Sequence, residues 1–269
     1  MSTTIDVLLL SVAMAAASGF IGSFAVMKRM ALAADPLSHV ALPGIGIALA
    51  MHINPMIGAA AMLVFGALLV WALEDRARSA TETVIGVVFS AALAVGSITT
   101  RGEDLIDALF GATGALGRWE MAFGIAMAAT IIAFIVTARN KLIVAFVSPD
   151  VARTAGIHVR RLDFFYLEAF ALTIALGLRF LGVLLMGALI IVPAASGRRL
   201  AGSLTSMLWI TVTVSVASTL IGTWIGLHFH RQTGPLIVLV ATGFFLLSLL
   251  PLRGFASKAD VVEESGPQN

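Results

Sequence analysis

A carboxylate and an imidazole stand four residues apart in the stretch 35–46, which reads DPLSHVALPGIG. Pro36 suits the first turn of a helix, and Asp35 is expected to cap that helix. Residues four apart lie on one helix face, so Asp35 and His39 can point toward the same ligand. An aspartate oxygen and a neutral histidine nitrogen suit a borderline divalent cation such as Zn²⁺ or Mn²⁺. The alternative is that Asp35 only caps the helix and His39 is an interior histidine with satisfied hydrogen bonds.

The elements that must position this pair are strongly apolar. Of the 269 residues, 59% are hydrophobic and only 12% are charged, and the mean hydropathy is +1.01. This composition is typical of a membrane protein. Ionisable groups at membrane depth are costly and are functional candidates by default. The net charge of +2 comes without a basic patch interleaved with aromatic residues, which argues against a nucleic-acid partner, and the chain has no cysteine for thiolate chemistry.

Apolar segments recur along the whole chain, and their spacing predicts an all-α polytopic fold with about nine transmembrane helices. The segments are approximately 5–27, 37–53, 55–73, 82–99, 120–138, 164–178, 181–196, 203–227 and 235–250. We expect residues 1–252 to form one transmembrane domain in contact with membrane lipid. Residues 253–269 are polar and are expected to form a disordered cytoplasmic tail.

The distribution of basic residues predicts the orientation of these segments. With the N-terminus outside, inner loops hold 13 Lys and Arg residues and outer loops hold 4, which accounts for all 17 in the chain. Cytoplasmic loops carry an excess of Lys and Arg, so the pattern favours an external N-terminus and a cytoplasmic C-terminus.

The inner loop 140–163 is more than a connector. Ser148, Pro149 and Asp150 are typical of a helix start and Gly156 of a helix end, so a short helix is predicted at about 149–157. One interpretation is a solvated basic loop beside anionic lipid, and the other is a docking helix for a soluble partner.

Four stretches of the sequence resemble a known family. They are MKRMALAADPLSHVALPGIGIALA (27–50), ETVIGVVFSAALAVGSI (82–98), SPDVARTAGIHV (148–159) and LRFLGVLLMGALIIVPAASGRRLA (178–201). In this order and with this DxxSHxxLPG element, the sequence resembles the permease subunit of the zinc, manganese and iron type ABC importers, the ABC-3 family.

The resemblance implies a homodimeric permease in the inner (plasma) membrane of a prokaryote, moving a divalent metal inward. Two cytoplasmic ATPase subunits would engage the coupling helix through Pro149, Asp150, Ala152, Arg153 and Gly156. A periplasmic or lipoprotein metal-binding protein would deliver the cation. Asp35 and His39 match the metal-contacting pair of the family, and a two-fold axis would double that pair. The substrate is expected to be Zn²⁺ or Mn²⁺, with a slight preference for zinc.

Other histidines are weaker metal candidates, namely His52, His228 and His230 at the outer ends of predicted spans. The sequence contains no GxxxxGK[ST] phosphate-binding loop, so ATP must be bound and hydrolysed by a partner chain. We therefore expect a transport subunit without catalytic residues or a cofactor of its own. The alternative function is a secondary metal-ion transporter driven by an ion gradient, which would need a proton or sodium relay.

Overall fold

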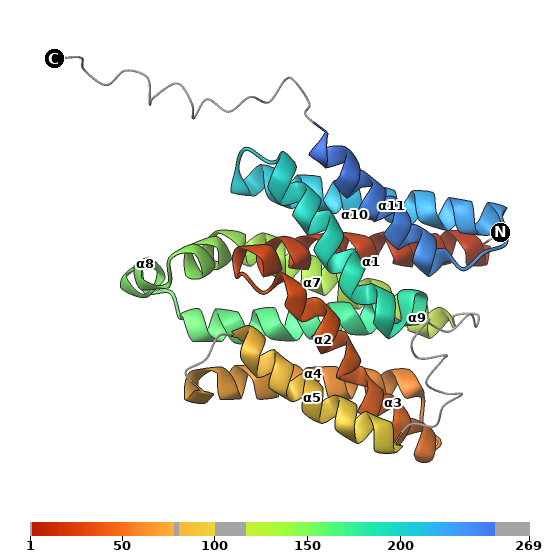
Figure 1. Cartoon of the computed structure of the whole chain (residues 1–269), viewed down its shortest axis with the longest axis horizontal. Helices are drawn as coiled ribbons and strands as arrows, with labels where there is room; N and C mark the ends of the chain where they lie inside the picture. The colour runs from red at the N-terminus through yellow and green to blue at the C-terminus, as the bar shows by residue number, and fades with distance from the viewer. Residues whose placement is uncertain (1, 78–80, 100–116, 251–269) are drawn as a thin grey trace.

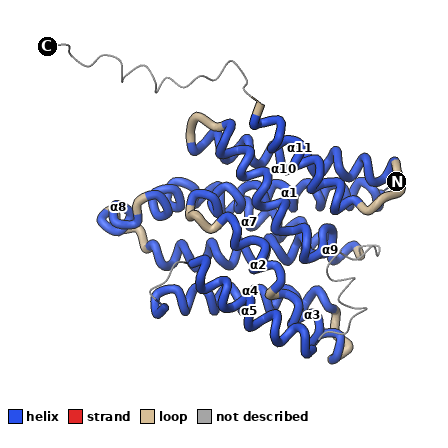
Figure 2. The backbone as a smooth tube through the Cα atoms, in the orientation of Figure 1, coloured by secondary structure: helices blue, strands red, loops and turns tan. Residues whose placement is uncertain are grey.

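The computed structural model describes residues 2–77, 81–99 and 117–250. Within these ranges the chain forms helices and no strand (Figure 2). The predicted tail, 253–269, lies outside the described residues. The elements are α1 (Ser2–Met27), the 3-10 helix η1 (Ala31–Ala33), α2 (Ala34–His39), α3 (Ala41–Ala50), α4 (Pro55–Ala77), α5 (Thr81–Thr99), α7 (Arg118–Val147), α8 (Pro149–Thr154), α9 (Val159–Leu200), α10 (Leu204–His228) and α11 (Thr233–Leu249).

Seven helical segments in the described part of the chain are long and apolar enough to cross a membrane. They are Leu8–Met27, Ala31–Ala50, Pro55–Glu74, Thr81–Thr99, Trp119–Val147, Leu181–Leu200 and Leu204–His228, and Thr233–Leu249 is a shorter apolar helix. Large apolar side chains such as Phe65, Val87 and Phe123 are exposed on the bundle, as expected where lipid covers it. The predicted all-helical, multi-pass membrane fold is confirmed, while the count of nine spans and their orientation stay predictions.

Helix α9 consists of two helices that reverse direction at Gly182. This residue has φ 71° and ψ 174°, a backbone conformation that glycine adopts without a steric penalty. A side-chain carbon on Gly177 would lie 1.9 Å from the sulfur of Met186, so the chain folds back on itself here. Figure 1 shows the second half crossing back over the bundle. The two halves correspond to the predicted segments 164–178 and 181–196.

Helix α7 is longer than the sequence suggested. Its predicted apolar run ended at residue 138, whereas the helix continues to Val147. Asn140 and Lys141 interrupt the apolar composition, but Leu142 and Ala145 are buried one turn apart and continue the packed face. The predicted inner loop 140–163 is therefore partly helical, and α8 follows α7 almost directly.

Small residues bring the helices around the Asp35 segment close together. Gly44 on α3 and Gly58 on α4 face each other so closely that a side-chain carbon on either would lie 2.1 Å from the carbonyl oxygen of the other. Such small-residue contacts let helix backbones approach in a membrane. Elsewhere in the bundle α1 packs against α7 and α9, with Phe24 and Tyr166 buried in the shared core (Figure 1).

Candidate metal centre

The segment that carries Asp35 and His39 begins with a tight turn after α1. Arg29 has a positive φ of 61°, and η1 then runs directly into α2. The N-cap of α2 is Ala33, with no capping side-chain hydrogen bond, so the prediction that Asp35 caps the helix is wrong. Because η1 supplies the turn before α2, Asp35 lies within the first helical turn, where a carboxylate still interacts favourably with the helix dipole.

A break separates α2 from α3 at Val40. Pro43 has no N–H group and cannot donate to the carbonyl of His39, four residues earlier. The Val40 N–H instead bonds the Leu37 carbonyl at 3.1 Å, a tighter turn than the α-helix. The single apolar segment predicted over 37–53 is thus two short helices, and His39 is the last residue of the first one.

The second half of α9 holds α2 in place. The Ser38 hydroxyl is fully buried and lies 2.9 Å from the Val183 carbonyl and 2.7 Å from the Asp35 carbonyl, either of which can accept its hydrogen bond. Gly187 packs directly on the backbone of Asp35, since an added side-chain carbon there would lie 2.9 Å from the Asp35 Cα. The residues just after the Gly182 turn therefore fix the position of the Asp35–His39 pair.

The two candidate ligands occupy different environments. Asp35 is exposed, whereas His39 is half-buried with its ring 5.7 Å from the ring of Phe89. The Nδ1 atom of His39 is buried and has no hydrogen-bond partner among the described residues. A buried imidazole nitrogen without a protein partner is costly, and a bound water or ion would satisfy it. The alternative interpretation is an interior histidine with satisfied hydrogen bonds. It does not hold for Nδ1 of His39, which has no partner among the described residues.

One chain does not complete a metal site. In the part of the chain that the structure describes, no group of three or more His, Asp or Glu side chains lies close enough together to hold a metal ion. Asp35 and His39 would supply two ligands on adjacent turns, and a closed first shell for zinc needs four. The remaining ligands would have to come from another molecule or from water.

The weaker histidine candidates lie away from this pair. His52 follows α3 and is exposed with φ 56°. His228, at the end of α10, is exposed and stacks on Trp224 with an interplanar angle of 6°, and His230 is exposed in the next turn with φ 50°. The structure brings none of them into a metal-binding group with Asp35 and His39.

The predicted short helix after α7 is present as α8, with Pro149 in its first turn. Asp150 and Arg153 form an exposed ion pair of 3.1 Å on its surface. Gly156 has φ 75° and ends the turn. Ala152, by contrast, is fully buried, because it faces the rest of the chain. The contact with a partner predicted for Ala152 stays a prediction, and the neighbouring Val151 is exposed.

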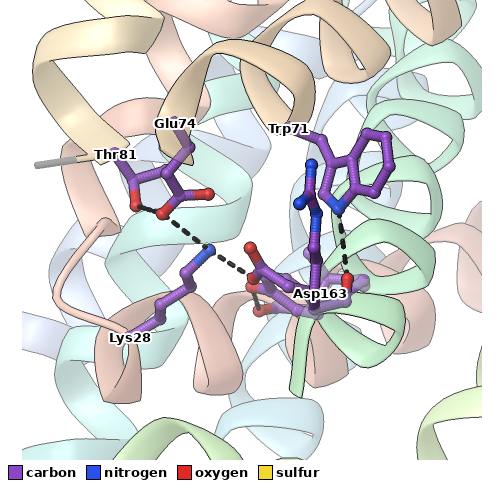
Figure 3. A network of polar contacts seen from close by, with 8 residues as sticks. Lys28, Trp71, Glu74, Thr81 and Asp163 are labelled. Carbon is purple, nitrogen blue, oxygen red and sulfur yellow. Dashed lines mark hydrogen bonds and ion pairs between the residues drawn. The ribbon is translucent and has the colours of Figure 1, made fainter. Parts of the chain in front are cut away.

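A second group of ionisable residues escaped the sequence reasoning. The Lys28 ammonium, just after α1, donates a hydrogen bond to Asp163 on α9 and lies 3.7 Å from the Glu74 carboxylate on α4 (Figure 3). The Thr81 hydroxyl of α5 donates to Glu74. Burial raises the pKa of the Asp163 carboxyl to about 6, against the opposing attraction of Lys28. We call Lys28, Glu74 and Asp163 the charge cluster.

No sequence pattern pointed to the charge cluster. Lys28 and Asp163 are 135 positions apart, and each is one charge at the edge of an apolar run. A single charge at such a position is ordinarily assigned to a loop, and Lys28 is one of the 13 basic residues assigned above to inner loops. The only usable signal is that both stand at the ends of long apolar segments that would meet at one side of a membrane.

Seven helical segments in the described part of the chain that are long and apolar enough to cross a membrane define a multi-pass membrane protein. The family model described as "ABC 3 transport family" matches residues 1–251, and the chain belongs to this family. The resemblance found in the sequence is thereby confirmed.

Relatives in this family cover almost the whole chain. The "Manganese transport system membrane protein MntC" of Listeria innocua is 33% identical over 95% of this chain and 94% of its own length. The "High-affinity zinc uptake system membrane protein ZnuB" of Haemophilus influenzae is 30% identical over 85% of this chain and 90% of its own. The solved structure "PsaBC from Streptococcus pneumoniae in complex with Fab" matches with a TM-score of 0.79 and 26% identity, covering 92% of this chain and 91% of that one.

Proposed function

We propose that the chain is the membrane permease of a bacterial ABC importer that moves a divalent metal cation, Mn²⁺ or Zn²⁺, into the cytoplasm. The energy would come from ATP hydrolysed by a separate subunit, since this sequence has no phosphate-binding loop. Relatives named for manganese, zinc and iron transport support metal as the substrate class. A protein that delivers the metal from outside would complete the system.

The observation that carries this proposal is the Asp35–His39 pair on an apolar span. Asp35 is exposed on the segment Ala31–Ala50, which is long and apolar enough to cross a membrane. A carboxylate does not face lipid at such a position and lines an interior or a water-filled path instead. With the unpartnered Nδ1 of His39 one turn away, oxygen and nitrogen ligands for a borderline cation are available.

A second copy of the chain would complete the site. A two-fold axis beside Asp35 would bring together two carboxylates and two imidazoles, the number of ligands that a tetrahedral site needs. It would also cover the exposed carboxylate. A cation held this way must bind firmly enough to enter and weakly enough to leave.

The test is metal uptake by proteoliposomes that contain the chain together with its ATPase subunits. ATP-dependent accumulation of Mn²⁺ or Zn²⁺, with one metal competing against the other, would support the proposal and identify the preferred cation. Uptake that requires an ion gradient and proceeds without ATP would refute it in favour of secondary transport.

A further inference from the structure

The charge cluster lies between the two segments to which we assign transport roles. Asp163 follows the end of α8, at Thr154, by nine residues, and Lys28 precedes Asp35 by seven residues. The hydrogen bond between Lys28 and Asp163 therefore joins the segment after α8 to the segment that leads into α2. Across 135 sequence positions, this hydrogen bond connects the start of α9, which follows α8, to the segment that enters the metal centre.

This contact is tight and is reinforced on both sides. The side chains of Lys28 and Asp163 are each 13% exposed. Breaking a buried ion pair by removing one partner leaves an uncompensated charge and is strongly destabilising. Nearby, the Trp71 indole N–H donates to the Arg160 carbonyl at 3.1 Å, and Tyr166 donates to the Ile21 carbonyl at 3.0 Å. The first turns of α9 are thus bonded to α1 and α4 together.

The same cluster faces the surroundings of α8. Lys28, Glu74 and Asp163 line a cleft of about 980 Å³ that is also lined by Pro149 and Arg153 of α8. A displacement of α8 can reach Lys28 through the covalent connection from α8 to α9 and the hydrogen bond between Asp163 and Lys28. A direct clash between α8 and α1 is not required.

The α1–α2 segment touches α9 on both sides of the Gly182 turn. Before the turn, Asp163 binds Lys28, and after it Val183 and Gly187 contact α2. A shift of the first half of α9 relative to the second would therefore pull on the chain between Lys28 and Asp35. Gly182, with its positive φ, is the point between the two contacts where the helix is interrupted.

We propose that Lys28, Asp163 and Glu74 are positioning residues for transport, which transmit movement of α8 through the start of α9 to the Asp35–His39 pair. This inference rests on the proposed function for the roles of α8 and of the metal centre. The cluster itself contacts no metal in this account. It determines whether the metal centre responds when the ATPase binds or hydrolyses ATP.

The absence of native cysteine allows a direct test. Leu32, between the cluster and Asp35, is 71% exposed, so Leu32→Cys can carry an environment-sensitive fluorophore. The labelled chain is assembled with its ATPase subunits in lipid, and the emission change on adding ATP is measured beside ATP hydrolysis and metal uptake. Lys28→Met removes the ion pair, and Lys28→Arg retains it. Arg29→Met is the matched control, since it removes a neighbouring positive charge whose side chain is exposed.

The inference predicts that Lys28→Met keeps ATP hydrolysis but loses the ATP-dependent emission change. Metal moved per ATP should fall about two- to thirtyfold, the range for mutations in a coupling network. Lys28→Arg and Arg29→Met should behave like the wild type. If Lys28→Met fails to assemble, Asp163→Asn replaces it, because it breaks the same pair and also removes the buried carboxylate charge.

Two results would separate the possible failures. A normal emission change and normal uptake in the ion-pair variant would overturn the transmission role and leave the cluster as a structural contact. A wild-type complex that moves no metal would refute the proposed function, and the emission change alone would then decide whether the cluster links α8 to α2.

Discussion

Two groups of ionisable residues in this chain differ in whether their side chains have hydrogen-bond or ion-pair partners. In the charge cluster, every member has a partner, and Lys28 is shared between Asp163 and Glu74. In the metal centre, Asp35 is exposed and Nδ1 of His39 has no hydrogen-bond partner in the described part of the chain. Both groups stand at or within apolar helices, where such residues are expensive.

The difference separates residues that hold the structure from residues that we propose to bind a ligand. A buried charge with a partner stabilises the arrangement of helices that brings the partners together, and its removal is costly. A polar group left without a partner gains nothing from the fold and calls for a functional explanation. Changes in the metal centre should therefore lower metal transport without lowering stability, whereas changes in the charge cluster should lower both stability and the metal moved per ATP.

The largest effect is expected on transport, from changes at Asp35. Asp35→Asn should lower metal uptake by at least about tenfold, since it removes the negative charge opposite the cation. Because Asp35 makes no capping hydrogen bond, Asp35→Ala should be as stable as Asp35→Asn. Uptake and thermal unfolding of both variants test this. A substantially lower stability of the alanine variant would restore the capping role.

The next largest effect is on stability, from Lys28→Met. Removing the cation from a buried pair should cost about 3–5 kcal/mol of unfolding free energy near neutral pH. The pKa of Asp163 is already raised to about 6 and would rise further without Lys28. The folded variant would then bind more protons than the unfolded chain, so its stability should increase as the pH falls through that raised value.

Thermal unfolding of Lys28→Met and wild type across this pH range checks the prediction. The difference in stability between wild type and Lys28→Met should become smaller as the pH falls. A difference that does not change with pH would mean that Glu74 and Asp163 are not the carboxylates that lose their cation in the variant. Asp163→Asn should be milder than Lys28→Met, because it also removes a carboxylate that burial penalises.

A smaller effect is expected at Gly187, where close packing and not charge fixes the position of α2. Gly187→Ala would place a carbon 2.9 Å from the Cα of Asp35, so α9 and α2 must move apart. Such overpacking typically costs about 1–3 kcal/mol. We expect weakened metal binding with Asp35 and His39 intact, measured by titration of the purified complex. Unchanged binding would show that the position of α2 is not set by this contact.

The smallest effect is expected at Gly156, which belongs to neither group. Its φ of 75° is unfavourable for a residue with a side chain, so Gly156→Ala should cost about 1 kcal/mol. It should change neither metal binding nor the pH dependence of stability. Thermal unfolding and metal titration of this variant provide the baseline, and a loss of metal binding would contradict the separation of the two groups.

Much of the fold followed from the sequence, because long apolar runs dictate membrane helices, and the gap between the predicted segments 164–178 and 181–196 lies close to the turn at Gly182. The break between α2 and α3 was not predicted, because it lies inside the apolar segment 37–53. The Asp35–His39 pair was found because a charge within an apolar run is visible locally. The cap of α2 was missed because η1 supplies the preceding turn. The charge cluster was missed because its members meet only through the packing of α1, α4 and α9.

The central claim is that Asp35 and His39 from two copies bind the transported metal. Elemental analysis of the purified complex, after equilibration with Mn²⁺ or Zn²⁺ and removal of free metal, tests it most directly. We predict one metal ion for two chains in the wild type and its loss in His39→Ala, with assembly unchanged. Equal metal content in His39→Ala and wild type would contradict the claim and place the metal elsewhere.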